Sequence, residues 1–155
     1  RFRYLLSEKF KIKQSQITDA FVMGEHGDSM VPIFSRVKIN EKNLLDVINE
    51  EEKKIISTEI QNYWKSLRIY KSRSQFGIAK NTFDVIRSII KNDELVIPAS
   101  IMLNGEYGEK NISMGIPVKI NKDGVKEIIE IKLSESERKL LEISAQTIRN
   151  YIKTL

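Results

Sequence analysis

The sequence predicts an α+β fold, in which long helices and short antiparallel strands occupy separate stretches of the chain. Apolar residues recur at helical spacing over 50–73 and 78–91, and three short segments rich in valine and isoleucine follow between 94 and 132. Separate runs of helices and strands, rather than strict alternation, are typical of this class. The 155 residues, 41% of them apolar and 30% charged, have the composition of one ordinary globular domain.

The first forty residues combine one helix with short extended segments. Apolar residues at four-residue intervals predict a helix over residues 1–10. Residues 17–23 predict a short strand, and the partly alternating apolar residues of 30–39 predict another. Pro32 cannot donate a backbone hydrogen bond, so it argues against a central position in a sheet.

Two helices are predicted in the middle of the chain. The first covers 50–73 and opens with three glutamates, which favour the N-terminus of a helix. The second runs from about Ile78 to Lys91. Its helical spacing predicts four inward-facing residues: Phe83, Ile86, Ile89 and Ile90.

The last third of the chain predicts strands followed by a helix. Segments 94–102, 112–120 and 124–132 are separated by turn dipeptides, and Asp123-Gly124 is a strong hairpin signal. Ser134 and Glu137 have the spacing of a capping box, in which each side chain bonds the other residue's amide. The helix that follows is predicted to bury Leu141, Ala145, Ile148 and Ile152.

Charge and composition exclude several classes of function. The net charge of +5 is spread over a surface of both signs, so we expect no nucleic-acid partner. No apolar run is long enough to span a membrane and no secretory leader opens the chain, so we expect no membrane partner and a cytoplasmic location. Zero cysteines and a single histidine leave no thiol nucleophile and no metal site of the usual kinds.

One segment has the features of a functional site rather than of a purely structural element. His26 lies between Gly24-Glu25 and Gly27, on a turn with little side-chain bulk. An imidazole changes charge near neutral pH, so an exposed one at a strand end suits proton transfer. Taken alone, a histidine in such a turn is more often a surface residue of no chemical role. A serine hydrolase is excluded because no G-x-S-x-G motif occurs, and neither common glycine-rich phosphate-binding motif is present.

Residues 24–32, Gly-Glu-His-Gly-Asp-Ser-Met-Val-Pro, resemble the active-site histidine segment of the L-lactate/malate dehydrogenase family. The opening Arg1-Phe-Arg-Tyr-Leu5 resembles the end of that family's Asp-x-x-Arg-Phe-Arg segment. Residues 74–79, residues 104–108 and the helix from Ser134 also match in order. The resemblance implies that residues 1–155 form a single C-terminal, substrate-binding and catalytic domain. It also implies that the N-terminal NAD-binding domain, in a protein about twice as long, is absent from this chain.

The resemblance assigns roles residue by residue. His26 matches the catalytic histidine, which exchanges a proton with the substrate while NAD exchanges a hydride. Arg1 matches the arginine that binds the substrate carboxylate. A guanidinium suits this role because it can donate two parallel hydrogen bonds to a carboxylate. Ser74 matches a threonine near the substrate. The family's aspartate partner of the histidine would lie upstream of Arg1, so we expect the isolated chain to be inactive.

Regulation and specificity are also expectations from the resemblance. In allosteric bacterial members an arginine and a histidine help bind fructose 1,6-bisphosphate. Arg3 matches the arginine, but Asp19 replaces the histidine, which argues against activation by this sugar. Lactate is favoured over malate by Glu25 and the Ser74 hydroxyl, and a homo-oligomer, dimer or tetramer, is expected. The alternatives are a malate dehydrogenase of lactate-dehydrogenase type and a non-catalytic oligomerisation or interaction module.

Overall fold

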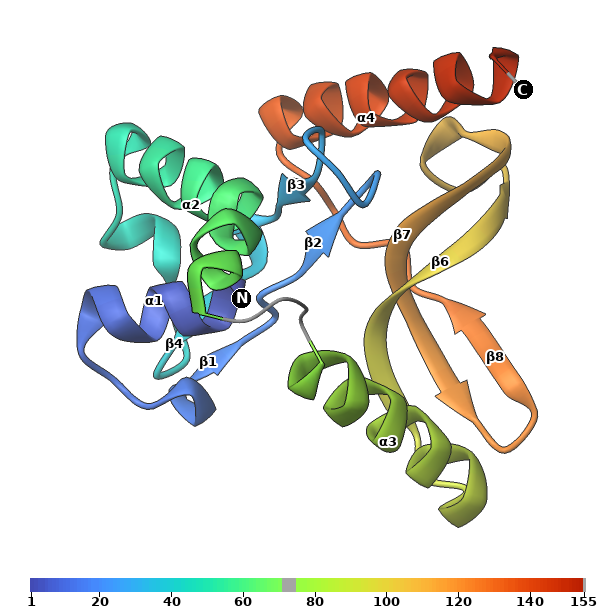
Figure 1. The fold of residues 1–155 in the computed structure, drawn as a ribbon, viewed down its shortest axis with the longest axis horizontal. Coiled ribbons are helices and arrows are strands. Elements are labelled where there is room, and N and C mark those ends of the chain that lie inside the picture. The colour runs from blue at the N-terminus through green and yellow to red at the C-terminus, as the bar shows by residue number, and fades with distance from the viewer. Residues whose placement is uncertain (71–74, 155) are drawn as a thin grey trace.

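The computed structural model of the chain describes residues 1–70 and 75–154 and has the predicted α+β architecture (Figure 1). Four α-helices and eight strands are assigned within these residues. The helices are α1 (Phe2–Phe10), α2 (Glu50–Tyr70), α3 (Phe76–Lys91) and α4 (Glu135–Lys153). The strands are β1 (Ile17–Thr18), β2 (Val22–Met23), β3 (Val31–Pro32), β4 (Lys38–Ile39), β5 (Lys42–Asn43), β6 (Leu95–Asn104), β7 (Lys110–Asn121) and β8 (Gly124–Ile128).

The strands form three antiparallel sheets. Their orders are β1-β4-β5, β2-β3 and β6-β7-β8. The β2-β3 pair reaches the third sheet through a bridge between Gly24 and Gly115. This bridge places the end of β2 against the middle of β7, far from it in sequence.

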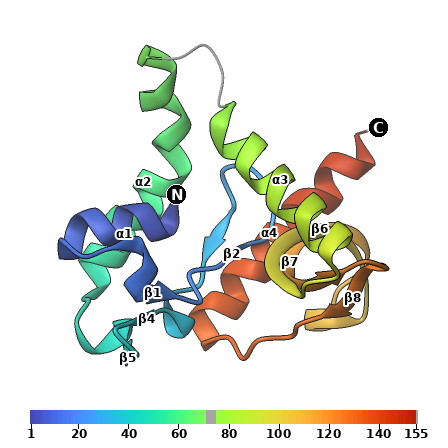
Figure 2. The same cartoon turned by 90° about the horizontal axis from the view of Figure 1, so that it is seen from below.

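Two hydrophobic cores lie on either side of β2. One packs α1, β1 and the first half of α2 together, with Leu6, Val37 and Leu44 fully buried. The other packs β3, β6 and β7 against α4 and includes Ile33, Ile116 and Ala145. Figure 2 shows α1 and α2 on one side of β2, with the large hairpin and α3 on the other. The segment after β2 therefore lies where the two packed halves meet.

The capping box and the hairpin confirm two local predictions. Ser134 accepts a hydrogen bond from the Glu137 amide (3.2 Å), and the Glu137 carboxylate accepts one from the Ser134 amide (2.9 Å). Strands β7 and β8 form a hairpin whose pairing ends at Asn121 and Gly124. Gly124 has φ +91°, a conformation that glycine adopts without steric cost.

The two strands predicted over 17–23 and 30–39 are each broken in two, which corrects the prediction. Asp19 has φ +53°, and its carbonyl accepts a hydrogen bond from the Phe21 amide (3.0 Å). This tight turn separates β1 from β2. A 3₁₀ turn at Phe34–Arg36 likewise separates β3 from β4. Alternating apolar residues do not reveal such turns, because the residues on either side are still buried.

The predicted inward face of the helix over 78–91 is also wrong. In α3 the buried contacts are made by Val85 and Ser88, which lie against the sheet of β6, β7 and β8. The four residues predicted to face inward are at least 37% exposed: Phe83, Ile86, Ile89 and Ile90. The helix is apolar on more than one side, so periodicity alone cannot say which side this chain covers. In α4 the predicted stripe holds for Leu141 and Ala145, but Ile152 is 49% exposed.

Candidate active site

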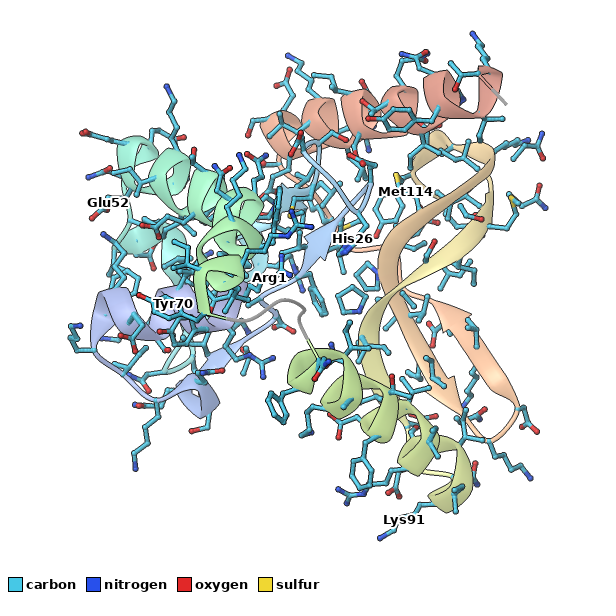
Figure 3. All side chains as sticks on the ribbon, in the orientation of Figure 1. Arg1, His26, Glu52, Tyr70, Lys91 and Met114 are labelled. Carbon is cyan, nitrogen blue, oxygen red and sulfur yellow. The ribbon has the colours of Figure 1, made fainter. Side chains whose placement is uncertain are left out.

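His26 lies on the loop that connects β2 to β3, and its side chain is exposed. Met23, the last residue of β2, is buried in the core, so the strand anchors one end of this loop. Figure 3 shows His26 near the middle of the view and Arg1 at the inner edge of the half formed by α1 and α2. An exposed imidazole on an anchored loop is accessible to a small molecule and can exchange a proton with it.

Gly24 permits the close approach on which the loop depends. Its amide donates to the Gly115 carbonyl (2.8 Å) and its carbonyl accepts from the Gly115 amide (2.9 Å). It has φ +92°, and a Cβ atom there would overlap the hydroxyl of Ser144. A side chain at position 24 would therefore displace α4 or the loop.

The Glu25 side chain contacts Ser29, four residues further along the same loop. Its Oε2 accepts hydrogen bonds from the Ser29 amide (3.1 Å) and the Ser29 hydroxyl (2.6 Å). A Cβ atom at Gly27 would overlap the Glu25 carboxylate, so Gly27 makes room for this arrangement. Gly24 thus has a steric reason to be glycine, whereas a side chain at Gly27 would displace only the end of the Glu25 side chain.

Two helices hold the loop from outside. Ser144 of α4 accepts a hydrogen bond from the Glu25 amide (2.8 Å). Gln61 of α2 donates from Nε2 to the Asp28 carbonyl (2.8 Å). His26 therefore lies between two residues, Glu25 and Asp28, that are held by helices from the two halves of the molecule.

Arg1 lies at the N-terminus of α1 and contacts the same part of α2. The centre of its guanidinium is 5.6 Å from the centroid of the Tyr63 ring, a cation–π distance. Tyr63 is two residues beyond Gln61, which holds the His26 loop. The structure thus brings Arg1 and the His26 loop to neighbouring residues of one helix. Ser74, the third predicted site residue, lies outside the described residues.

Ser144 and Gln61 are not predicted from the sequence, and Ser29 is predicted only as part of the segment that carries His26. Ser144 carried a usable signal, because it lies between Leu141 and Ala145 on the buried face of a helix. A buried hydroxyl needs a hydrogen-bond partner, so a serine on such a face predicts a polar contact. The partner itself is 119 residues away, and no local pattern identifies it.

Among residues 1–70 and 75–154 there is neither a group of metal ligands nor a helix that could span a membrane. These residues contain no group of three or more histidine, aspartate or glutamate side chains that could hold a metal ion. Over the same residues, no helix combines the length and hydropathy that a membrane span requires.

Comparison with known proteins decides the family. The family model described as the lactate/malate dehydrogenase α/β C-terminal domain matches residues 1–155. The chain belongs to the lactate/malate dehydrogenase family. This family consists of oxidoreductases, and the match covers the C-terminal domain, in agreement with the resemblance in the sequence.

Relatives within the family carry both names. A malate dehydrogenase of Halobacterium salinarum is 34% identical over 96% of this chain, and an L-lactate dehydrogenase 2 of Listeria innocua is 33% identical over 100% of it. The chain spans about half the length of each, 48% and 51%.

Solved structures of family members have the same fold. The malate dehydrogenase of Aeropyrum pernix superimposes with a TM-score of 0.92 at 26% identity, covering 99% of this chain and 52% of that one. A minor L-lactate dehydrogenase of Enterococcus mundtii gives 0.92 at 26%, with 99% and 51% covered.

Proposed function

We propose that this chain is the substrate-binding and catalytic half of an NAD-dependent L-2-hydroxyacid dehydrogenase that interconverts pyruvate and L-lactate. The observation that carries the proposal is the exposed His26 imidazole on a loop that both halves of the domain hold in place. In a member of this family, such a group is the expected proton donor and acceptor.

His26 would act as a general acid in the reduction of pyruvate. Negative charge develops on the C2 oxygen as the ketone is reduced. A protonated imidazole within hydrogen-bond distance stabilises that charge and then transfers its proton to the oxygen. In the reverse direction the neutral imidazole accepts the proton from the lactate hydroxyl.

Arg1 would bind the substrate carboxylate. A guanidinium is planar and donates two parallel hydrogen bonds to a carboxylate, which a lysine ammonium cannot do. Arg1 contacts Tyr63 of α2, and Gln61 of the same helix holds the His26 loop. We infer from the family resemblance, not from this spacing, that Arg1 and His26 contact one substrate. The carboxylate and the C2 oxygen of a 2-keto acid are carried by adjacent carbon atoms.

The usual glycine-rich nucleotide-binding motif is absent from this chain. None of its seven glycines forms the G-x-G-x-x-G pattern that brings backbone amides against a pyrophosphate. The relatives are twice as long, and we assign nucleotide binding to the remainder of such a protein. When bound, NADH supplies the hydride that reduces the keto carbon.

Lactate remains our first choice of substrate and malate the second. Glu25 is one of the two residues that favour lactate in the sequence. In the structure its carboxylate accepts two hydrogen bonds from Ser29 and holds the loop. The preference for lactate therefore depends on the hydroxyl of Ser74. Malate stays the alternative because a malate dehydrogenase and an L-lactate dehydrogenase match this chain almost equally, at 34% and 33% identity, and because Met30-Val-Pro32 suits both types.

Steady-state kinetics of the complete protein would decide between the two substrates. NADH oxidation is measured with pyruvate and with oxaloacetate under the same conditions. We expect the larger kcat/KM for pyruvate. A larger kcat/KM for oxaloacetate would show that the protein is a malate dehydrogenase. No turnover of either substrate would favour a non-catalytic oligomerisation or interaction module.

A further inference from the structure

We propose that Ser144 is a positioning residue for His26, acting through a closed ring of hydrogen bonds that joins α4 to the catalytic loop. This inference rests on the proposed function, since it concerns the residue that would transfer the proton. The ring contains Ser144, Ser29 and both ends of Glu25, its amide and its carboxylate.

The direction of each hydrogen bond follows from the number of protons. The Glu25 amide donates to the Ser144 hydroxyl oxygen (2.8 Å). The Ser29 hydroxyl donates its single proton to the Glu25 carboxylate (2.6 Å), because an ionised carboxylate only accepts. In the contact between the two hydroxyls (3.3 Å), Ser144 must therefore be the donor. The ring runs from the Glu25 amide through Ser144 and Ser29 back to the Glu25 carboxylate.

Burial of Ser144 makes its hydrogen bonds in this ring costly to break. Ser144 is 0% exposed, so water cannot replace a partner that is lost. Its neighbours on α4, Leu141 and Ala145, are packed in the core and fix the position of its hydroxyl. A buried donor or acceptor that loses its partner is costly, so the ring favours one arrangement of the loop.

The ring determines where His26 lies. The imidazole follows directly from Glu25, whose amide and carboxylate are both in the ring, and precedes Gly27, which the carboxylate lies against. Gly27 itself offers no side chain that could hold the backbone. Ser144 is therefore the contact by which a helix far away in sequence sets the position of the proton donor.

The decisive variant is Ser144→Ala in the complete protein, with Thr147→Val as the matched control. Both remove a hydroxyl from α4, but that of Thr147 bonds only the Ile143 carbonyl of its own helix (3.0 Å). We expect kcat with pyruvate, or with whichever substrate proves better, to fall roughly 10- to 100-fold in Ser144→Ala, since small misplacements of reacting groups have effects of this size. We expect the NADH dissociation constant to stay within about twofold, and Thr147→Val to match the parent in both.

Two readouts separate positioning from general loss of structure. Hydrogen exchange of residues 24–29, measured by mass spectrometry without substrate or cofactor, should accelerate in Ser144→Ala and not in Thr147→Val. With deuterated NADH, the primary isotope effect on kcat should rise in Ser144→Ala, because the chemical step becomes slower. A lower kcat with unchanged exchange, or faster exchange with unchanged kcat, would overturn the proposal.

Ser29→Ala gives an independent route if Ser144→Ala does not fold. It breaks the same ring from the loop side and leaves the packing of α4 intact. We expect the same pattern, and in the double variant we expect a loss in kcat no larger than that of the worse single one. Losses that multiply would mean that the two hydroxyls act separately, which contradicts the ring.

His26→Asn, assayed in parallel, distinguishes failure of this inference from failure of the proposed function. If His26→Asn keeps its activity, the function proposed for His26 is wrong, and the positioning role falls with it. If His26→Asn is inactive while Ser144→Ala behaves like Thr147→Val, the function stands and only the role of Ser144 is refuted.

Discussion

In the function proposed above, His26 supplies the chemistry of the site and its neighbours supply its position. The exchange of an imidazole for an amide of similar shape therefore removes proton transfer and leaves the hydrogen bonds of the loop in place. We expect His26→Asn to lower kcat of the complete protein by about 10²- to 10⁴-fold, the usual contribution of general acid–base catalysis. NADH binding, followed by fluorescence titration, should be unchanged. A variant with near-normal kcat would exclude His26 as the proton donor.

At the same scale, the sequence was informative wherever a residue's role depends on its immediate neighbours. His26 could be singled out because Gly24 and Gly27 surround it, and the structure gives a steric reason for Gly24. Ser144 could not be connected to the loop, because its partners at Glu25 and Ser29 are more than a hundred residues away. Long-range polar contacts leave no periodic trace in the sequence.

At the scale of elements, the capping box of α4 also connects that helix to the rest of the domain. The Glu137 carboxylate accepts hydrogen bonds from the Ser35 amide (2.9 Å), the Ser35 hydroxyl (2.6 Å) and the Ser134 amide (2.9 Å). Burial by itself would raise the pKa of Glu137, but these hydrogen bonds outweigh it and hold the pKa below the ordinary 4.5. The capping box, which the sequence predicts as a local motif, thus also binds the first turn of α4 to Ser35 in the 3₁₀ turn after β3.

Glu137→Gln should destabilise the fold by about 1–3 kcal/mol at pH 7, because an amide nitrogen would face a backbone donor where a carboxylate oxygen now accepts. The folded-state pKa is lowered, so the stabilisation by Glu137 is fully present above the unfolded pKa and is lost as pH falls through the folded one. The difference between parent and variant should therefore be constant near pH 7 and shrink below about pH 4.5.

Thermal unfolding across this pH range measures the effect. Glu135→Gln is the control on the same helix, since Glu135 pairs with Lys139 (3.0 Å) at the surface and such pairs contribute little. A difference for Glu137→Gln that grows on acidification would contradict the assignment.

The elements also show where pattern-based prediction fails. Helix existence and approximate extent were predictable from periodicity, as α1, α2 and α4 illustrate. The inward face of α3 was not, because Phe83 and Ile90 have the same spacing as a core stripe and yet are exposed. The strand breaks at Asp19 and at Phe34–Arg36 depend on single backbone conformations, which apolar spacing does not report.

At the scale of the whole molecule, the loop that carries His26 lies where two hydrophobic cores meet. Gln61 holds it from one half and Ser144 from the other, so the site requires both. The chain nevertheless spans only about half the length of its relatives and has no glycine-rich nucleotide-binding loop. We therefore expect the purified 155-residue chain to oxidise no NADH with pyruvate or oxaloacetate. Measurable turnover in a spectrophotometric assay would refute this, with the complete protein as the positive control.

Regulation is a property of the assembled protein, and Asp19 bears on it. In allosteric bacterial relatives, by the resemblance noted above, a histidine at this position and an arginine at position 3 help bind fructose 1,6-bisphosphate between subunits. Here Arg3 is exposed, whereas Asp19 lies in the tight turn between β1 and β2. Its backbone carbonyl bonds the Phe21 amide, which fixes the turn that carries the carboxylate. A carboxylate at that place repels a phosphate group instead of attracting it.

We accordingly expect fructose 1,6-bisphosphate to leave the pyruvate KM of the complete protein within about twofold of its value without the sugar, because like charges at a binding site weaken the binding. The measurement is a titration of the sugar at fixed NADH and subsaturating pyruvate, with an allosteric bacterial lactate dehydrogenase assayed alongside. Asp19→Asn tests the cause, since it removes the charge and keeps the turn. If the parent protein responded to the sugar with a sharp fall in KM, its regulatory site would have to use cations other than the pair that the resemblance indicates.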